Sequence, residues 1–177
     1  MFQAAGSPVR VLVAVASKMG STAEIAEAVA ARLRAGSHEA TVVPVGEAPG
    51  PEAFDAVVVG SAVYIRGWEK AALRYLTEHR EALRARPTYL FESGPSGDRS
   101  ESEHNASAKV LRLAEKIGYR PPTVFGGNVD PTRATGRLAK WVASGDMAGD
   151  YRDWNMINTW ADQIARDLGR DSPPSHG

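Results

Sequence analysis

The stretch that decides the fold is VLVAVASKMGSTAEIAEAVAARL, residues 11–33. It begins as an apolar run typical of a buried strand, passes through a short polar loop, and ends with Ile25, Val29 and Leu33 at helical spacing. A strand that leads through Gly20 straight into a helix places unpaired N–H groups and the positive end of the helix dipole at the loop. The loop at residues 17–22 is therefore predicted to be either an anion site or an ordinary capped turn.

Residues 17–22 favour a single phosphate as the anion. Gly20 lets the backbone approach a ligand closely, the loop's three hydroxyl side chains add donors, and Lys18 adds positive charge. The loop lacks the spacing of a nucleotide triphosphate loop and the three glycines of a dinucleotide fingerprint. Ser21 and Glu24 stand at capping-box spacing, which predicts that the helix begins with Ser21 as its N-cap.

The same alternation of strand and helix continues along the chain. Residues 9–16 form the first predicted strand, and further strands are predicted at 40–45, 55–60, 87–92 and 123–127. Strands that alternate with helices predict a parallel sheet covered on both faces. Pro44 cannot donate a ladder hydrogen bond, so its strand is expected at an edge of the sheet.

The later helices are predicted from apolar residues that recur every three or four positions. A short helix is also expected over residues 134–143, and the last helix over 153–168. The predicted apolar faces are Ala72, Tyr75, Leu76, His79 and Leu83 for the second helix, Val110, Leu111, Ala114 and Ile117 for the third, and Trp154, Ile157, Trp160, Ala161, Ile164 and Leu168 for the last.

Composition narrows the possible functions. The 177-residue chain carries 21 basic and 21 acidic side chains, so nothing in its charge predicts a nucleic-acid partner. There is no cysteine, so redox chemistry would need a bound organic cofactor. No apolar run approaches the roughly 20 residues of a membrane span, and the expectation is a cytoplasmic protein without an integral membrane segment. The four histidines (His38, His79, His104 and His176) lack metal-ligand spacing, so no metal is predicted.

Three further stretches carry a family resemblance: VVVGSAVYIRGWEKAALRYL (57–76), FGGNVDPTR (125–133) and GDYRDWNMINTWADQIA (149–165). With the loop Ser-Lys-Met-Gly-Ser-Thr, the chain resembles the flavodoxin-like family, whose first loop reads Ser/Thr-x-x-Gly-x-Thr and wraps the phosphate of FMN. Within that family it is similar to the flavodoxin-type menaquinone-dependent protoporphyrinogen IX dehydrogenases and their uncharacterised bacterial relatives.

The resemblance implies an α/β fold, a doubly wound five-stranded parallel sheet in the order 2-1-3-4-5 with helices on both faces. The domain would span residues 9–168, between an N-terminal extension (1–8) and a disordered tail (169–177). FMN would lie at the carboxyl ends of the strands. The residues implied for the phosphate are Ser17, Lys18, Met19, Gly20, Ser21 and Thr22, and those for the ring are Ser61, Ala62, Val63, Tyr64 and Ile65 together with Ser93, Gly94, Pro95, Ser96 and Gly97.

The surroundings of the ring leave alternatives open. Tyr64 and Trp68 are read either as a wall for the flat ring or as packing at the start of a helix. The arginines that could meet a substrate carboxylate at the rim, or lie on the solvated surface, are Arg66, Arg99, Arg133 and Arg137. The predicted substrate-binding residues are Arg66, Trp68 and Arg133.

Residues 150–153 are predicted to be structural. Asp150 or Asp153 is expected to cap the last helix, and Arg152 to form a local ion pair.

The function expected from these patterns is an FMN-dependent oxidoreductase in which the flavin, rather than a catalytic side chain, carries the chemistry. Its substrate would be a flat small molecule such as a quinone or a porphyrinogen, because residues 92–97 contain no aromatic side chain to cover the ring and the net charge is zero. Many small electron-carrier flavodoxins differ on both points. The alternatives are a non-catalytic electron carrier with a redox protein partner and a flavin-free module that acts through protein contacts. The oligomeric state is open and includes a homodimer.

Overall fold

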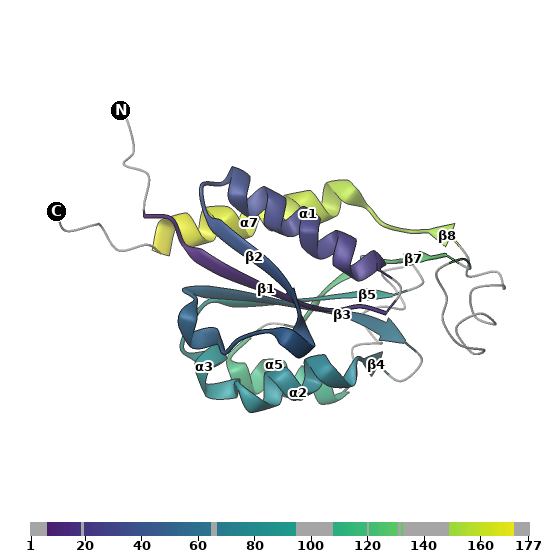
Figure 1. Ribbon diagram of the computed structural model, residues 1–177, viewed down its shortest axis with the longest axis horizontal. Coiled ribbons are helices and arrows are strands. Elements are labelled where there is room, and N and C mark those ends of the chain that lie inside the picture. Colours follow the sequence, from purple (N-terminus) through teal and green to yellow (C-terminus); the bar gives the residue numbers. More distant parts are fainter. Residues whose placement is uncertain are drawn as a thin grey trace.

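The protein is described by a computed structural model that places residues 7–18, 20–64, 67–94, 108–119, 121–130, 132 and 149–171. Its main sheet contains five parallel strands in the order β2-β1-β3-β5-β6 (Figure 1). These strands are β1 (Arg10–Ala16), β2 (Glu39–Pro44), β3 (Ala56–Tyr64), β5 (Thr88–Gly94) and β6 (Thr123–Gly126). The order confirms the predicted five-stranded arrangement, and Pro44 lies on an edge strand as expected.

Two short pairings were not predicted. β4 (Gly67–Trp68) lies antiparallel to the end of β3, and β7 (Asn128–Val129) pairs with β8 (Gly149–Asp150) in a separate two-stranded sheet. Because β3 extends into this hairpin, residues 61–64, which the sequence placed in a loop, belong to a strand. Ser93 and Gly94 likewise belong to the end of β5.

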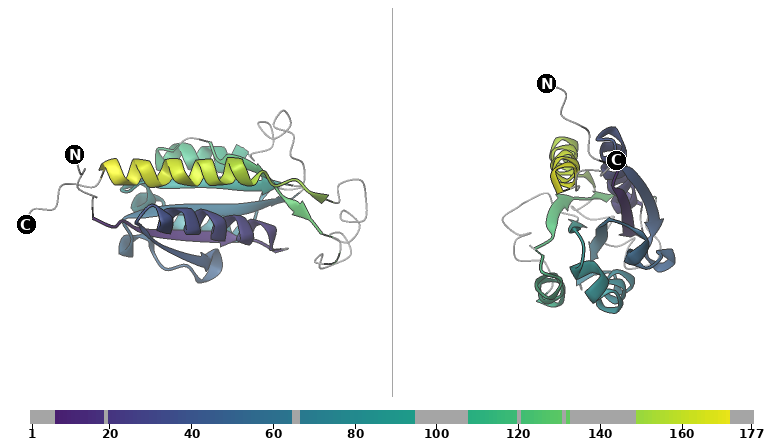
Figure 2. Two further views of the ribbon diagram at one scale, coloured as in Figure 1. Left: turned by 90° about the horizontal axis from the view of Figure 1, so that it is seen from above. Right: turned by 90° about the vertical axis from the view of Figure 1, so that its left-hand side faces the viewer.

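Helices cover both faces of the sheet. α1 (Ser21–Ala35) and α7 (Trp154–Asp171) lie on one face, and α2 (Lys70–Glu78), α3 (Arg80–Arg84) and α5 (Ala108–Ile117) on the other (Figures 1 and 2). Two short 3₁₀ helices, η1 (Val45–Glu47) and η2 (Pro51–Ala53), join β2 to β3.

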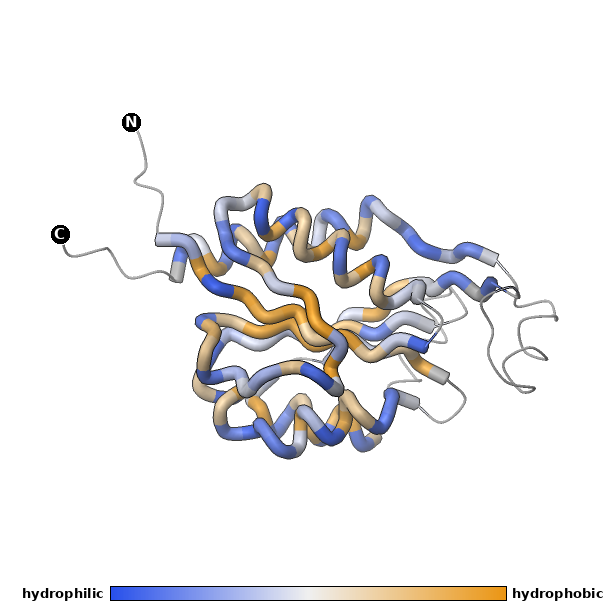
Figure 3. Tube along the Cα trace, in the orientation of Figure 1, coloured by the Kyte–Doolittle hydropathy of each residue, from blue (hydrophilic) through white to orange (hydrophobic). Residues whose placement is uncertain are grey.

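Strand alternation divides the core into two layers. On β1, Val13 packs under α1 and α7, whereas its neighbours Leu12 and Ala14 pack under α2 and α5. Both faces of β1 and β3 are therefore buried, which explains why these central strands are nearly continuously apolar and mainly orange in Figure 3.

The helices depart from the predicted pattern in several places. The second predicted helix is divided at His79, whose φ of −103° and ψ of 18° separate α2 from α3 and whose ring packs against Tyr75 at a centroid distance of 4.5 Å. Leu111 and Trp154, both placed on apolar faces by the sequence, are exposed. Helical periodicity predicted these helices, but it did not determine which apolar residues of each helix pack against the sheet.

The ends of the chain also differ from expectation. α7 continues to Asp171, three residues past its predicted end, so residues 169–171, which the sequence assigned to the tail, are helical. Residues 1–6, 172–177 and the predicted helix at 134–143 lie outside the described residues.

The described residues contain neither a candidate membrane span nor a candidate metal cluster. Within them, no helix combines the length and the apolar composition that crossing a bilayer requires. No group of three metal-ligating side chains comes together in the same part of the chain.

Candidate functional site

The start of α1 lies at the carboxyl edge of the sheet, after the short loop that follows β1. Gly20 is the N-cap in a left-handed conformation (φ +88°), and no side chain in the described part of the chain caps the helix. Ser21 is the first helical residue, so the predicted capping box is wrong. The Glu24 carboxylate contacts Arg152 instead of reaching back to the cap. Because the cap lacks a side-chain acceptor, no capping partner among the described residues competes with an anion for the N–H groups of the first turn.

The loop before α1 is held by its own side chains. Ser17 Oγ accepts a hydrogen bond from the Gly20 N–H at 3.1 Å, which fixes the turn. Lys18 Nζ lies 3.3 Å from a carboxylate oxygen of Glu69 at the start of α2. Of the predicted phosphate residues, Met19 lies outside the described residues.

A buried hydrogen bond joins α1 to the end of β5. Thr22 Oγ1 and Ser93 Oγ are 2.7 Å apart, and both side chains are buried. The structure thus brings together two residues that the sequence assigned to opposite ends of the flavin. Because both hydroxyls are buried and paired with each other, we interpret them as residues that position the two segments.

Glycine allows a third segment to approach at this place. The Gly127 N–H donates to the Gly94 carbonyl at 2.6 Å. A Cβ on Gly127 would lie 2.8 Å from that carbonyl oxygen and 3.6 Å from Ser21 Oγ. The end of β5 and the residue after β6 therefore meet through a backbone contact that leaves no room for a side chain at Gly127, with Ser21 of α1 at ordinary van der Waals distance.

The predicted ring residues after β3 have divided roles. Ser61 is fully buried, donates to the Ala62 carbonyl at 2.9 Å and accepts from the Glu69 N–H at 3.0 Å, so its hydroxyl holds the β3–β4 hairpin to α2. Ala62 is buried and Val63 is half-buried. Tyr64 pairs with Gly67 in the backbone ladder.

Trp68 is a core residue. Its side chain is 4% exposed, it packs under α2, and its indole N–H donates to Glu92 Oε2 at 2.7 Å. This burial agrees with the packing alternative and does not fit the predicted substrate contact, because almost none of the ring is open to a ligand.

Glu92 is a residue that sequence reasoning missed. The residue is 2% exposed near the end of β5, and burial raises the pKa of its carboxyl, with a smaller opposite effect from the Trp68 donor. The available signal was an acidic residue inside an otherwise apolar buried strand, because such residues are rarely buried without a partner.

Arg152 links the start of α7 to α1. Its side chain is 7% exposed, contacts Glu24, and makes two hydrogen bonds to Asp150 at 2.6 and 2.7 Å. The hydrogen bonds to Asp150 raise the pKa of Arg152 and lower that of Asp150. The guanidinium also lies 4.7 Å from the centre of the Trp154 ring. The predicted local ion pair of Arg152 is confirmed, and the same side chain also pairs with Glu24 of α1.

The cap of α7 is settled in favour of Asp153. Its Oδ1 accepts a hydrogen bond from the Met156 N–H at 3.0 Å, which is the geometry of an N-cap. Asp150 instead accepts hydrogen bonds from Arg152.

Several predicted residues lie outside the described part of the chain, and their roles stay predictions. They are Met19, Ile65, Arg66, Pro95, Ser96, Gly97, Arg99, Arg133 and Arg137.

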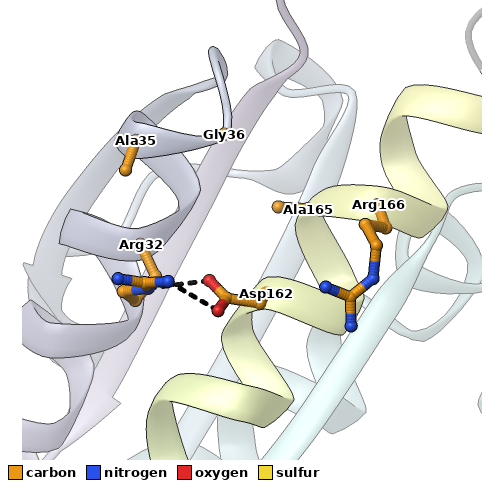
Figure 4. A pocket seen from close by; sticks show the side chains of 6 residues that line it. All are labelled: Arg32, Ala35, Gly36, Asp162, Ala165 and Arg166. Carbon is orange, nitrogen blue, oxygen red and sulfur yellow. Dashed lines mark hydrogen bonds and ion pairs between the residues drawn. The ribbon is translucent and has the colours of Figure 1, made fainter.

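A shallow pocket lies elsewhere, between the end of α1 and α7 (Figure 4). Arg32 makes two hydrogen bonds to Asp162 there, at 2.7 and 2.6 Å, with Arg166 on the other side of the carboxylate. Its lining residues come from α7 and from the end of α1 opposite Gly20, so it is not part of the candidate site.

The class of the protein follows from these features. β1 lies between β2 and β3, and α1 and α2 leave the carboxyl edge toward opposite faces of the sheet, which makes this edge a topological switch point. Together with the uncapped start of α1, this arrangement is typical of doubly wound α/β proteins that bind phosphorylated ligands.

The particular family is shown by comparison. Residues 12–135 match the family described as flavodoxin domain, so the chain belongs to the flavodoxin family. Membership indicates FMN as the cofactor. None of the curated proteins compared with the chain matches it.

Solved structures share the fold at low sequence identity. An archaeal flavodoxin superimposes with a TM-score of 0.61 at 13% identity, over 90% of this chain and 98% of the other. A WrbA-like flavodoxin from Agrobacterium tumefaciens gives a TM-score of 0.58 at 16% identity, over 93% and 99%. Rubredoxin oxygen:oxidoreductase from Desulfovibrio gigas gives a TM-score of 0.59 at 17% identity. The match includes 92% of this chain but only 37% of that larger protein. These similarities establish the fold.

Proposed function

We propose that this chain is an FMN-dependent oxidoreductase that holds the cofactor at the carboxyl edge of the sheet. The observation that carries the proposal is the uncapped start of α1, with Gly20 in the left-handed region and Thr22 bonded to Ser93. A phosphate would receive the first-turn N–H groups of α1, and the helix dipole favours its charge.

The residues around this edge have separate tasks. Ser17 holds the turn, Ser21 lies at the edge of the helix start, and Lys18 supplies positive charge beside it. The Thr22–Ser93 bond fixes the distance between the phosphate segment and the segment at Gly94. Gly127 approaches the Gly94 carbonyl too closely for a side chain, whereas a Cβ on Gly94 would meet nothing within 4 Å, so the end of β5 has open space beside it.

Bound FMN would supply the transfer of electrons or hydride, and the chain would supply placement and electrostatics. The small side chain of Ala62 and the half-buried Val63 would border the ring on the β3 side, with Tyr64 and Ile65 continuing the same strand end and loop. On the other side, Gly94 and the following residues 95–97 complete the proposed ring site.

The proposed substrate is a flat organic molecule such as a quinone or a porphyrinogen, with Arg66 and Arg133 meeting its anionic groups. The zero net charge supports a small-molecule substrate over a strongly basic protein partner. An electron carrier remains the second candidate, because two of the compared structures are flavodoxins by name. A cytoplasmic location belongs to the same proposal and is tested by cell fractionation.

Flavin binding is tested with the purified chain. Its visible spectrum should show flavin bands as isolated or after incubation with FMN, and FMN should bind more tightly than riboflavin because riboflavin lacks the phosphate. Gly20→Ala should weaken FMN binding, since an alanine at φ +88° strains the loop by about 1–2 kcal/mol. Gly169→Ala in α7, where a Cβ would meet nothing within 4 Å, is the matched control. A chain that takes up no FMN would refute the proposal.

Turnover then separates the two candidate functions. Steady-state oxidation of NADH or NADPH with a quinone as acceptor would support an enzyme. A chain that accumulates the one-electron-reduced form and turns over only when a separate reductase is added would support the carrier.

A further inference from the structure

We infer that Glu69 recognises the hydroxyl-bearing chain of the ligand, the segment that joins the phosphate of FMN to its ring. This inference rests on the proposed function, because it assigns a specificity role to one residue of the proposed FMN site. Glu69 was not among the residues that the sequence assigned to the site.

The first observation is an acceptor without a donor. Glu69 Oε1 is buried and has no hydrogen-bond partner among the described residues, while Oε2 lies 3.3 Å from Lys18 Nζ. A buried polar atom that lacks a partner is costly and uncommon in native proteins. The carboxylate of Glu69 therefore has acceptor capacity that the described residues leave unused.

The second observation is the direction of the side chain. Glu69 occupies the N-cap position of α2, where a side-chain oxygen could accept an N–H group of the first turn, yet it makes no such bond. The carboxylate is directed instead toward Lys18 in the loop after β1. The residue thus forgoes a stabilising cap and faces the proposed phosphate loop.

The third observation is the position of the backbone. The Glu69 N–H is held by Ser61 Oγ at the end of β3, at 3.0 Å. Glu69 therefore contacts both the loop proposed for the phosphate and the strand end proposed for the ring. A ligand that extends from the phosphate loop to the end of β3 would therefore pass close to Glu69.

The chemistry of the acceptor selects the ligand group. An ionised carboxylate only accepts hydrogen bonds and repels a phosphate, so it suits neutral O–H donors. The chain between the phosphate and the ring of FMN carries hydroxyl groups, which are such donors. The side chain of Glu69 is 14% exposed, and a carboxylate oxygen has more than one lone pair, so Oε2 can accept a ligand hydroxyl while it faces Lys18.

The test compares three flavins on the full-length chain by fluorescence titration. FMN and riboflavin both carry the hydroxyl chain, whereas lumiflavin has a methyl group in its place. Glu69→Ala should weaken riboflavin by about tenfold or more, the loss typical of a hydrogen bond to a charged group, and leave lumiflavin unchanged. FMN should lose less than riboflavin, because the substitution also removes a negative charge beside the phosphate and frees Lys18. Glu69→Gln, which keeps the length of the side chain and a weaker acceptor, should cause a smaller loss in the same order.

The matched control is Lys18→Met, which removes the other half of the ion pair. It should weaken FMN more than riboflavin, because Lys18 acts on the phosphate. Equal weakening of all three flavins by both Glu69 variants would show a purely structural role and overturn the inference, as would unchanged riboflavin binding. Failure of the wild-type chain to bind FMN would instead refute the proposed function.

Discussion

Replacing Glu92 by Gln is expected to remove a pH dependence from the stability of the fold. The Glu92 carboxyl is buried, accepts a hydrogen bond from the Trp68 indole at 2.7 Å, and has a pKa that burial raises. The folded chain therefore keeps this proton at pH values where the unfolded chain has lost it. Glu92→Gln keeps an oxygen for the indole and cannot ionise, so the variant isolates the effect of the proton.

The sign and size of the effect follow from linkage. An unfolded Glu titrates near about 4.3, so the contribution of Glu92 is fully present below that pH. As the pH rises from this value through the raised pKa of the folded state, the contribution is lost at a rate of up to about 1.4 kcal/mol per pH unit. Wild-type stability should therefore fall relative to Glu92→Gln as the pH rises through this interval.

Urea unfolding at a series of pH values measures the difference. Glu27→Gln, on the exposed side of α1, controls for the loss of one acidic side chain, and its curve should run parallel to that of the wild type. Trp68→Phe should extend the interval to higher pH, because the indole donor lowers the pKa of Glu92. Parallel curves for the wild type and Glu92→Gln would refute the linkage.

Three further substitutions test the contacts at the carboxyl edge, each by urea or thermal unfolding. Thr22→Val keeps the shape of the side chain and should cost about 1–3 kcal/mol, because Ser93 loses its buried partner; adding Ser93→Ala should then cost little more, and full additivity would contradict the contact. Gly127→Ala should cost about 1–3 kcal/mol, since its Cβ meets a carbonyl oxygen at 2.8 Å, whereas Gly169→Ala should be neutral or stabilising; similar effects of the two would be inconsistent with the tight approach. Arg152→Met should cost about 1.5–3 kcal/mol through its charged hydrogen bonds, and a loss that high salt abolishes would show that the pairing is only a surface effect.

The sequence by itself determined the architecture and the position of the proposed phosphate loop. Strands buried on both faces must be continuously apolar, and each returns to the sheet through a helix with a three- or four-residue period, so local patterns sufficed. The turn at Gly20 was also predictable from the sequence, because the strand, the glycine and the helix that form it are adjacent along the chain. The capping box failed because Gly20, in a left-handed conformation, took the N-cap position that the spacing gave to Ser21.

Only the tertiary structure decided which side chains complete the site. Thr22 and Ser93 are 71 residues apart, and Arg152 and Glu24 are 128 apart, so no local period relates the members of either pair. Trp68 became a core residue because the end of β3 folds back into a hairpin and carries the indole under α2, onto Glu92. Hydrogen bonds between distant segments depend on how the strands are placed side by side, and the order of residues along one strand or helix does not contain that information.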